Sequence, residues 1–165
     1  TAYLVRTGDT ARDVRAEGYP AASEMAGGRV TVRVEDSPGV TDRKDVMFYF
    51  TGAVDVPGIA SNDYLPGAVA DHLTSAGGVL VGGTQMSSLR WLEAGATGSY
   101  GTVVEPCNLT AKFPHPGLLM RRYTSGETLV EAYWKSVAMP GQGLFIGEPL
   151  ARPYGSPAGA GMIAR

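Results

Sequence analysis

The stretch Val46-Met47-Phe48-Tyr49-Phe50, followed by Thr51-Gly52, decides the fold of this 165-residue chain. Its five apolar residues do not alternate with polar ones, so a strand built from them is apolar on both faces. Strands of this kind lie between two layers, as the central strands of parallel sheets do. Thr51-Gly52 then ends the run with turn residues. The stretch therefore predicts a central, parallel strand.

Shorter strand patterns lie on both sides of this stretch. They are expected over residues 3–5, 30–34, 79–81, 98–104 and 144–146. Val30, Val32 and Val34 alternate with polar residues, which is typical of a strand with one wet face near a sheet edge. Because helical patterns separate the strands, the sequence predicts a three-layer α/β/α fold around a mainly parallel sheet of about five strands.

Two of the helical patterns bear on function. Val69, Leu73 and Ala76 follow Pro66 at helical spacing, which predicts a helix over 66–76 that ends at Gly77-Gly78. Residues 53–65 before it are expected to form a long loop. Later in the chain, Thr124 and Glu127 have the spacing of a capping box at the start of another helix.

Composition excludes several classes of protein. The net charge is −2 and no basic run is present, so the sequence predicts no nucleic-acid partner. No apolar run approaches the roughly 20 residues that span a bilayer, so no membrane span is expected in this chain. With Cys107 as the one cysteine, an internal disulfide is impossible. Residues 1–150 are expected to form a single α/β domain, and 151–165 an extended tail rich in glycine and proline.

Cys107 is the candidate nucleophile. It follows the strand expected over 98–104, and ligands of open α/β sheets lie beyond the carboxyl ends of the strands. A cysteine nucleophile needs a base that holds it as thiolate. His72 is the candidate base, because the helix expected over 66–76 could pack over the strand ends.

Asp71 or Glu105 would orient that base, and backbone N–H groups around Asn108 would stabilise an oxyanion. The competing interpretation is structural: Cys107 is a small buried apolar residue, and His72 is hydrogen-bonded to the backbone. A metal site is a further alternative, from His72, Glu105, Cys107 and His115. None of these residues has the spacing of paired ligands, so the sequence predicts no metal and no cofactor.

Several segments resemble a known group of proteins. Phe48-Tyr49-Phe50-Thr51-Gly52 and Gly147-Glu148-Pro149-Leu150 are among them, with residues 65–73, 94–107 and 126–134. Together they resemble an uncharacterised bacterial family found in genomes that carry exosortase protein-sorting systems. Members of that family have an additional N-terminal region. The resemblance implies a secreted or cell-surface location, and that the chain is the C-terminal part of a longer protein.

At greater distance the chain is similar to gingipain-type and caspase-like cysteine peptidases. Thr128-Leu129-Val130-Glu131-Ala132 and Gly147-Glu148-Pro149 keep the late part of their order. The catalytic part differs, because Thr51-Gly52 stands where those peptidases place cysteine and no His-Gly pair precedes it. The resemblance therefore implies a caspase-like fold without inherited peptidase chemistry.

Two functional hypotheses follow. The first is a non-catalytic, caspase-like module that acts in assembly or binding, with a protein partner, a second copy or its own N-terminal region. The second is a cysteine hydrolase that uses Cys107 with His72.

Overall fold

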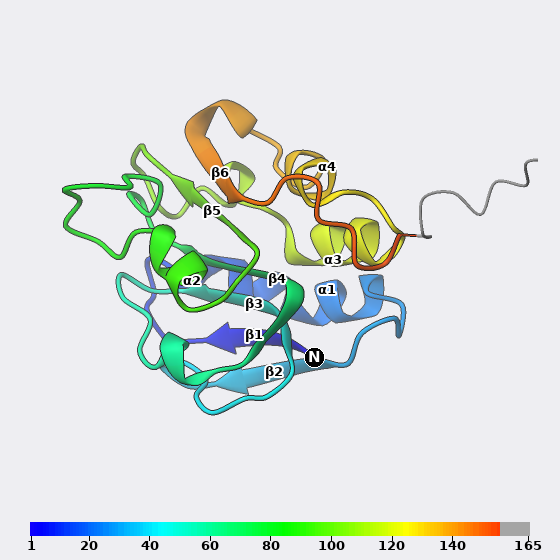
Figure 1. Cartoon of the computed structure of the whole chain (residues 1–165). Coiled ribbons are helices and arrows are strands. Elements are labelled where there is room, and N and C mark those ends of the chain that lie inside the picture. The colour runs from blue at the N-terminus through cyan, green and yellow to red at the C-terminus, as the bar shows by residue number, and fades with distance from the viewer. Residues whose placement is uncertain (156–165) are drawn as a thin grey trace, which may run out of the picture.

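A computed structural model describes residues 1–155, and within them it shows a six-stranded sheet flanked by helices (Figure 1). The strands are β1 (Ala2–Arg6), β2 (Val32–Asp36), β3 (Val46–Gly52), β4 (Tyr64–Leu73), β5 (Gly98–Thr102) and β6 (Gly143–Gly147). Their order is β2-β1-β3-β4-β5-β6. The first five run parallel to their neighbours, and β6 runs antiparallel to β5. The predicted α/β fold with a mainly parallel sheet is confirmed.

Strand β3 is the centre of the sheet, as its unbroken apolar run predicts. All seven of its residues are buried, and it pairs with β1 on one side and β4 on the other. Phe48 and Phe50 belong to one hydrophobic core, and Tyr49 belongs to the second core on the opposite face. A strand apolar on both faces thus has a packed layer on each.

The two layers differ in size. Helices α1 (Tyr19–Met25), α3 (Pro116–Thr124) and α4 (Leu129–Trp134) cover the face of Phe48. Helix α2 (Leu89–Glu93) lies on the other face, where Trp91 packs edge-on against Tyr49 with ring centroids 4.9 Å apart. Four short 3₁₀ helices lie in the connections: η1 (Asp13–Gly18), η2 (Ile59–Ser61), η3 (Thr110–Lys112) and η4 (Pro140–Gln142).

The helix predicted over 66–76 is wrong, because residues 66–73 belong to strand β4, which ends at Leu73. The pairing of β4 with β3 is irregular between Val46 and Phe48, and Gly67 has a φ of +89°, so the strand is bent where Pro66 enters it. From Ala68 onward every residue of β4 is buried. The extended piece predicted over 79–81 is also wrong: it lies in a loop, with Val81 87% exposed.

The capping box predicted at Thr124 and Glu127 is wrong in position. Thr124 ends α3, and its hydroxyl donates to the carbonyl of Met120. The capping box lies four residues later, where the backbone N–H of Thr128 donates to Glu131 and begins α4. Gly126, at a φ of +94°, turns the chain between the two helices.

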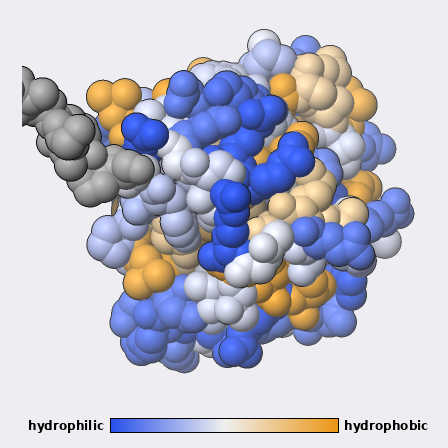
Figure 2. All heavy atoms as spheres, turned by 90° about the vertical axis from the view of Figure 1, so that its right-hand side faces the viewer, coloured by the Kyte–Doolittle hydropathy of each residue, from blue (hydrophilic) through white to orange (hydrophobic). Residues whose placement is uncertain are grey.

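The residues that follow β6 pack against the body as far as the structure describes them. Tyr154 packs edge-on against Tyr123 of α3 with ring centroids 5.9 Å apart, and the Arg152 side chain donates to the carbonyl of Gly126. Residues 151–155 of the predicted tail thus contact α3 and the turn that follows it, and 156–165 lie outside the described residues. Figure 2 shows separate apolar patches among polar side chains on the face from which the chain continues.

Candidate functional site

Cys107 lies at the carboxyl edge of the sheet, as predicted, in the loop that follows β5. Its sulfur is 3.5 Å from the carbonyl oxygen of Ala11, which lies in the loop that follows β1. The side chain is partly exposed. A carbonyl oxygen accepts a hydrogen bond but is not a base that removes the thiol proton, so this contact does not prepare a nucleophile.

His72 lies in a closed environment of its own. It is fully buried near the end of β4, and its Nδ1 accepts a hydrogen bond from the Trp91 indole at 2.9 Å. Its Nε2 donates to the carbonyl of Met86 at 2.9 Å. Burial lowers the pKa of His72 to about 4, so the ring is neutral near pH 7. Both ring nitrogens are occupied, and neither is free to take a proton from Cys107.

Asp71 points to the opposite face of β4 from His72, because side chains alternate along a strand. Its carboxylate forms an ion pair with Arg15 of η1 at 2.6 Å, with both side chains almost fully buried. Burial alone would lower the pKa of Arg15, but the charge of Asp71 raises it above its ordinary value. Asp71 is thus committed to Arg15 and does not orient the imidazole of His72.

Glu105 is exposed in the loop after β5, without a hydrogen bond or ion pair to another residue among 1–155. The four predicted site residues are therefore not brought together. Cys107 and Glu105 share a surface loop, whereas His72 and Asp71 lie on opposite faces of a buried strand. The alternative of a metal site is not supported either, because among the described residues no three His, Cys, Asp or Glu side chains lie close enough together to hold an ion.

At the ends of β3 and β5 the carboxyl edge is filled by main chain. A Cβ on Gly52, at the end of β3, would overlap the carbonyl of Arg12, and one on Gly101 in β5 would overlap the backbone of Gly78. The Arg12 side chain also bridges this edge, since it pairs with Asp9 at 3.0 Å and donates to Thr74 at 3.1 Å. The loops after β1 and β4 thus close over the ends of β3 and β5, where an open sheet could hold a ligand.

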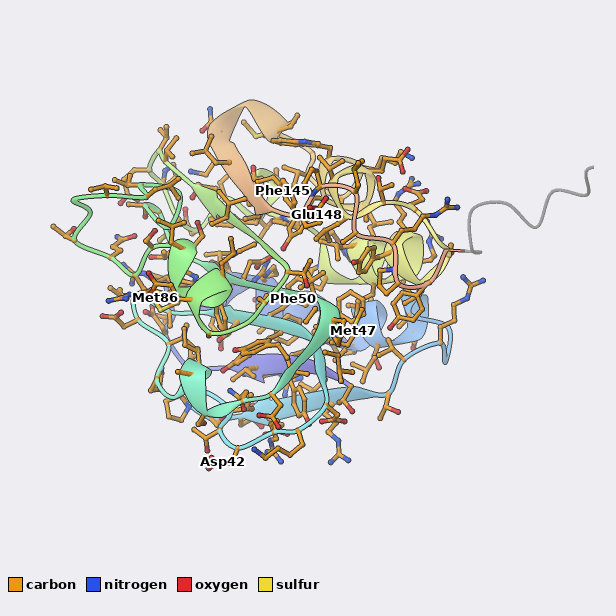
Figure 3. All side chains as sticks on the ribbon, in the orientation of Figure 1. Asp42, Met47, Phe50, Met86, Phe145 and Glu148 are labelled. Carbon is orange, nitrogen blue, oxygen red and sulfur yellow. The ribbon has the colours of Figure 1, made fainter. Side chains whose placement is uncertain are left out.

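A different part of the sheet is open, namely the outer side of β6. No strand among residues 1–155 pairs with it. Leu144 on β6 is 44% exposed, and Phe145 points to the other face, where its ring lies 5.1 Å from that of Tyr133 (Figure 3). The strand Gly-Leu-Phe-Ile-Gly carries no charge and no proline, so it lacks the devices that usually protect an edge.

Exposed apolar side chains are frequent on β6 and in the segments that adjoin it or its neighbour β5. Among residues 1–155, seven of the eleven exposed large hydrophobic residues lie on β6 or on segments that flank it in the chain or the sheet. They are Val103, Val104, Leu109, Trp134, Met139, Leu144 and Leu150. Trp134 packs edge-on against Tyr100 of β5. Two backbone hydrogen bonds join the flanking segments to each other, because Val103 donates to the carbonyl of Gln142 and Met139 donates to that of Ala111. We call the outer side of β6 with these side chains the β6 edge.

Sequence reasoning missed Arg15 and Trp91, the partners of Asp71 and His72. Arg15 lies 56 positions before Asp71, and nothing local to it signals burial. Trp91 could have been found, because a large aromatic residue in a short helix beside a buried strand is rarely exposed.

In comparisons with known proteins, no family model, no curated protein and no solved structure matches the chain. No helix in the described part of the chain has the length and apolar character to cross a membrane.

Proposed function

We propose that this chain is a non-catalytic, caspase-like module of a secreted or cell-surface bacterial protein, and that it acts in assembly. The assembly contact is the β6 edge, which pairs with the β6 edge of a second copy. The caspase-like relationship and the location rest on the sequence resemblance. The assembly role rests on one observation, an uncharged edge strand without a partner on its outer side among residues 1–155, with exposed apolar side chains on it and in the segments that adjoin it or β5.

A second copy suits this edge for a geometric reason. Two copies related by a twofold axis present the same strand to each other in antiparallel directions, so each outward N–H meets a carbonyl. Strand β6 has no charged side chain, and like charges therefore do not meet across the axis. The exposed apolar residues beside it would be removed from water together.

The alternative function, a cysteine hydrolase, has in its favour only the place of Cys107 at the carboxyl edge. Its base would be His72, which is buried, neutral near pH 7 and bonded through both ring nitrogens. A hydrolase mechanism would need β4 and α2 to separate first. The assembly role needs no such rearrangement.

Sedimentation velocity on the full chain tests the proposal with two matched variants. Leu144→Lys places a charge on the β6 edge, and Val34→Lys places one on β2, the opposite edge strand, at a similarly exposed valine. We expect wild type and Val34→Lys to form dimers over a micromolar concentration series, and Leu144→Lys to remain monomeric. A monomeric wild type, or a Leu144→Lys variant that still forms dimers, would refute the β6 edge as the contact.

A further inference from the structure

A pocket lies where four segments meet. They are η1, the η3 segment, the beginning of α3 and the residues that follow α4. Its volume is about 480 Å³, within the range of sites that hold small organic molecules. The proposed assembly does not use it.

The walls of the pocket are mainly apolar. Val14, Phe113, Leu118, Val137 and Ala138 line it, together with the two prolines beside His115. Phe113 and Val137 are buried from solvent, and Leu118 and Ala138 are more exposed. Such a surface binds an apolar body by removing it from water.

Positive groups surround one part of this apolar surface. Arg15 lines the pocket and is 6% exposed. Its Nη1 donates to the carbonyl of Pro114 at 3.3 Å. Its buried Nε has no hydrogen-bond partner among residues 1–155. Lys135 lines another wall of the pocket. Its Nζ forms an ion pair with Oε2 of Glu127, which lies outside the pocket, at 3.0 Å. Of the described residues that line the pocket, Glu17 carries the one carboxylate.

The beginning of α3 adds to this positive character. The helix has nine residues, its first residue is Pro116, and the positive end of its dipole faces the pocket through His115 and Leu118. Nδ1 of His115 accepts from the N–H of Leu118 at 3.3 Å, which leaves Nε2 to carry the proton of the neutral ring as a donor. Burial, and to a lesser extent the charge of Arg15, lowers the pKa of His115.

We infer that this pocket binds a carboxylate with an apolar body. The apolar part contacts Phe113, Leu118 and Val137, and the carboxylate lies between His115 and Lys135 near the start of α3. Two sources share this chemistry: a free medium-chain acid, and the C-terminal carboxylate of a peptide that ends in an apolar residue.

Titration calorimetry and amide chemical shifts of the full chain, with octanoate as the probe, test the inference. Octanoate should bind with a Kd between about 10 μM and about 5 mM, as expected for a ligand of this size. It should shift the amide signals of Gly18, Gly117 and Leu118. Octanamide should bind about tenfold more weakly, because it cannot form charge-assisted hydrogen bonds. The peptide is tested in the same way, by comparing acetyl-Ala-Leu with its C-terminal amide. If octanoate binds more tightly than acetyl-Ala-Leu, the ligand is a free acid; if acetyl-Ala-Leu binds more tightly, it is a peptide C-terminus.

Two variants locate the site. Ala138→Trp fills the pocket from a partly solvated position and should abolish binding, and Lys135→Gln should weaken it about tenfold. Arg121→Gln, at the far end of α3, removes an exposed cation outside the pocket and should leave the Kd unchanged. A cooperative thermal unfolding transition checks that the Ala138→Trp variant is folded. If that variant does not fold, Leu118→Gln is tested in its place. Equal affinity for octanoate and octanamide, tighter binding of octylamine, or no binding of either carboxylate up to about 10 mM would overturn the inference.

Discussion

The indole Nε1 of Trp91 donates a hydrogen bond to Nδ1 of His72 at 2.9 Å, between α2 and the sheet. This bond fixes the neutral ring with its proton on Nε2, which donates in turn to Met86 in the loop before α2 (Figure 3). One imidazole thus ties β4 to the helix and the loop that cover it. The residue that sequence reasoning assigns to catalysis has a structural role.

The burial of His72 makes stability depend on pH. The pKa of His72 is about 4 in the folded chain and near 6.5 when unfolded, so between these values only the unfolded state binds the proton. Stability should be fullest above pH 6.5 and should decrease by up to about 3 kcal/mol as the pH falls toward 4.

The variant His72→Gln isolates this contribution from that of the carboxylates. The free energy of unfolding in urea, measured from pH 7 to pH 4, should decrease less steeply in the variant than in wild type. If the free energy of unfolding falls equally steeply in both proteins, His72 takes up its proton at the same pH in the folded and the unfolded chain.

The ion pair between Arg15 and Asp71 should behave as a unit. Asp71→Ala leaves the buried guanidinium uncompensated and should cost about 3–5 kcal/mol of unfolding free energy. The double variant Arg15→Met, Asp71→Leu removes both charges and should recover much of that loss, because desolvation of the pair offsets its attraction. Costs that simply add in a double-mutant cycle would contradict the coupling.

The part of the fold that the sequence predicts is the part set by local pattern. The unbroken run at Val46 to Phe50 predicts its own place in the sheet, and the valine alternation before it predicts the edge strand β2. In β4 local pattern misleads. Asp71 and His72 resemble the wet face of a helix, but Arg15 and Trp91, distant in sequence, make them acceptable inside the sheet.

The candidate site follows the same division. The place of Cys107 after a strand is predictable from its neighbours. Whether an imidazole faces Cys107 depends on the direction in which the His72 side chain points from β4. The sequence predicts a helix there instead of a strand, and a helix points the side chain in a different direction. The β6 edge could not be predicted, because exposure at an edge is a property of the whole sheet.

The close approach of main chain at the carboxyl edge makes Gly101 intolerant of any side chain. Gly101→Ala would force the backbone at Gly78 away from β5 and should cost at least about 1–3 kcal/mol. Gly141→Ala is the matched control, because a Cβ there meets no atom within 4 Å. Equal midpoints of thermal unfolding for the two variants would show that the edge is open.

Cys107 should react as an ordinary, partly exposed thiol. Its sulfur contacts the carbonyl of Ala11, and its environment provides no imidazole. The rate of alkylation by iodoacetamide at pH 7, followed by intact mass, should therefore not exceed that of glutathione. A rate about a hundredfold faster would indicate an activated thiolate and revive the hydrolase alternative.

Disulfide trapping tests the assembly claim most directly, because Cys107→Ser yields a chain free of cysteine. In that background Leu144→Cys lies on the β6 edge and Val34→Cys on the opposite edge strand. With the twofold axis at Leu144, the two Leu144 positions lie directly opposite each other with Cα atoms within about 5.5 Å, close enough for a disulfide. We predict that mild oxidation converts Leu144→Cys, but not Val34→Cys, into covalent dimers at micromolar concentration. Equal yields of covalent dimer from the two variants, or none from either, would contradict assembly through β6.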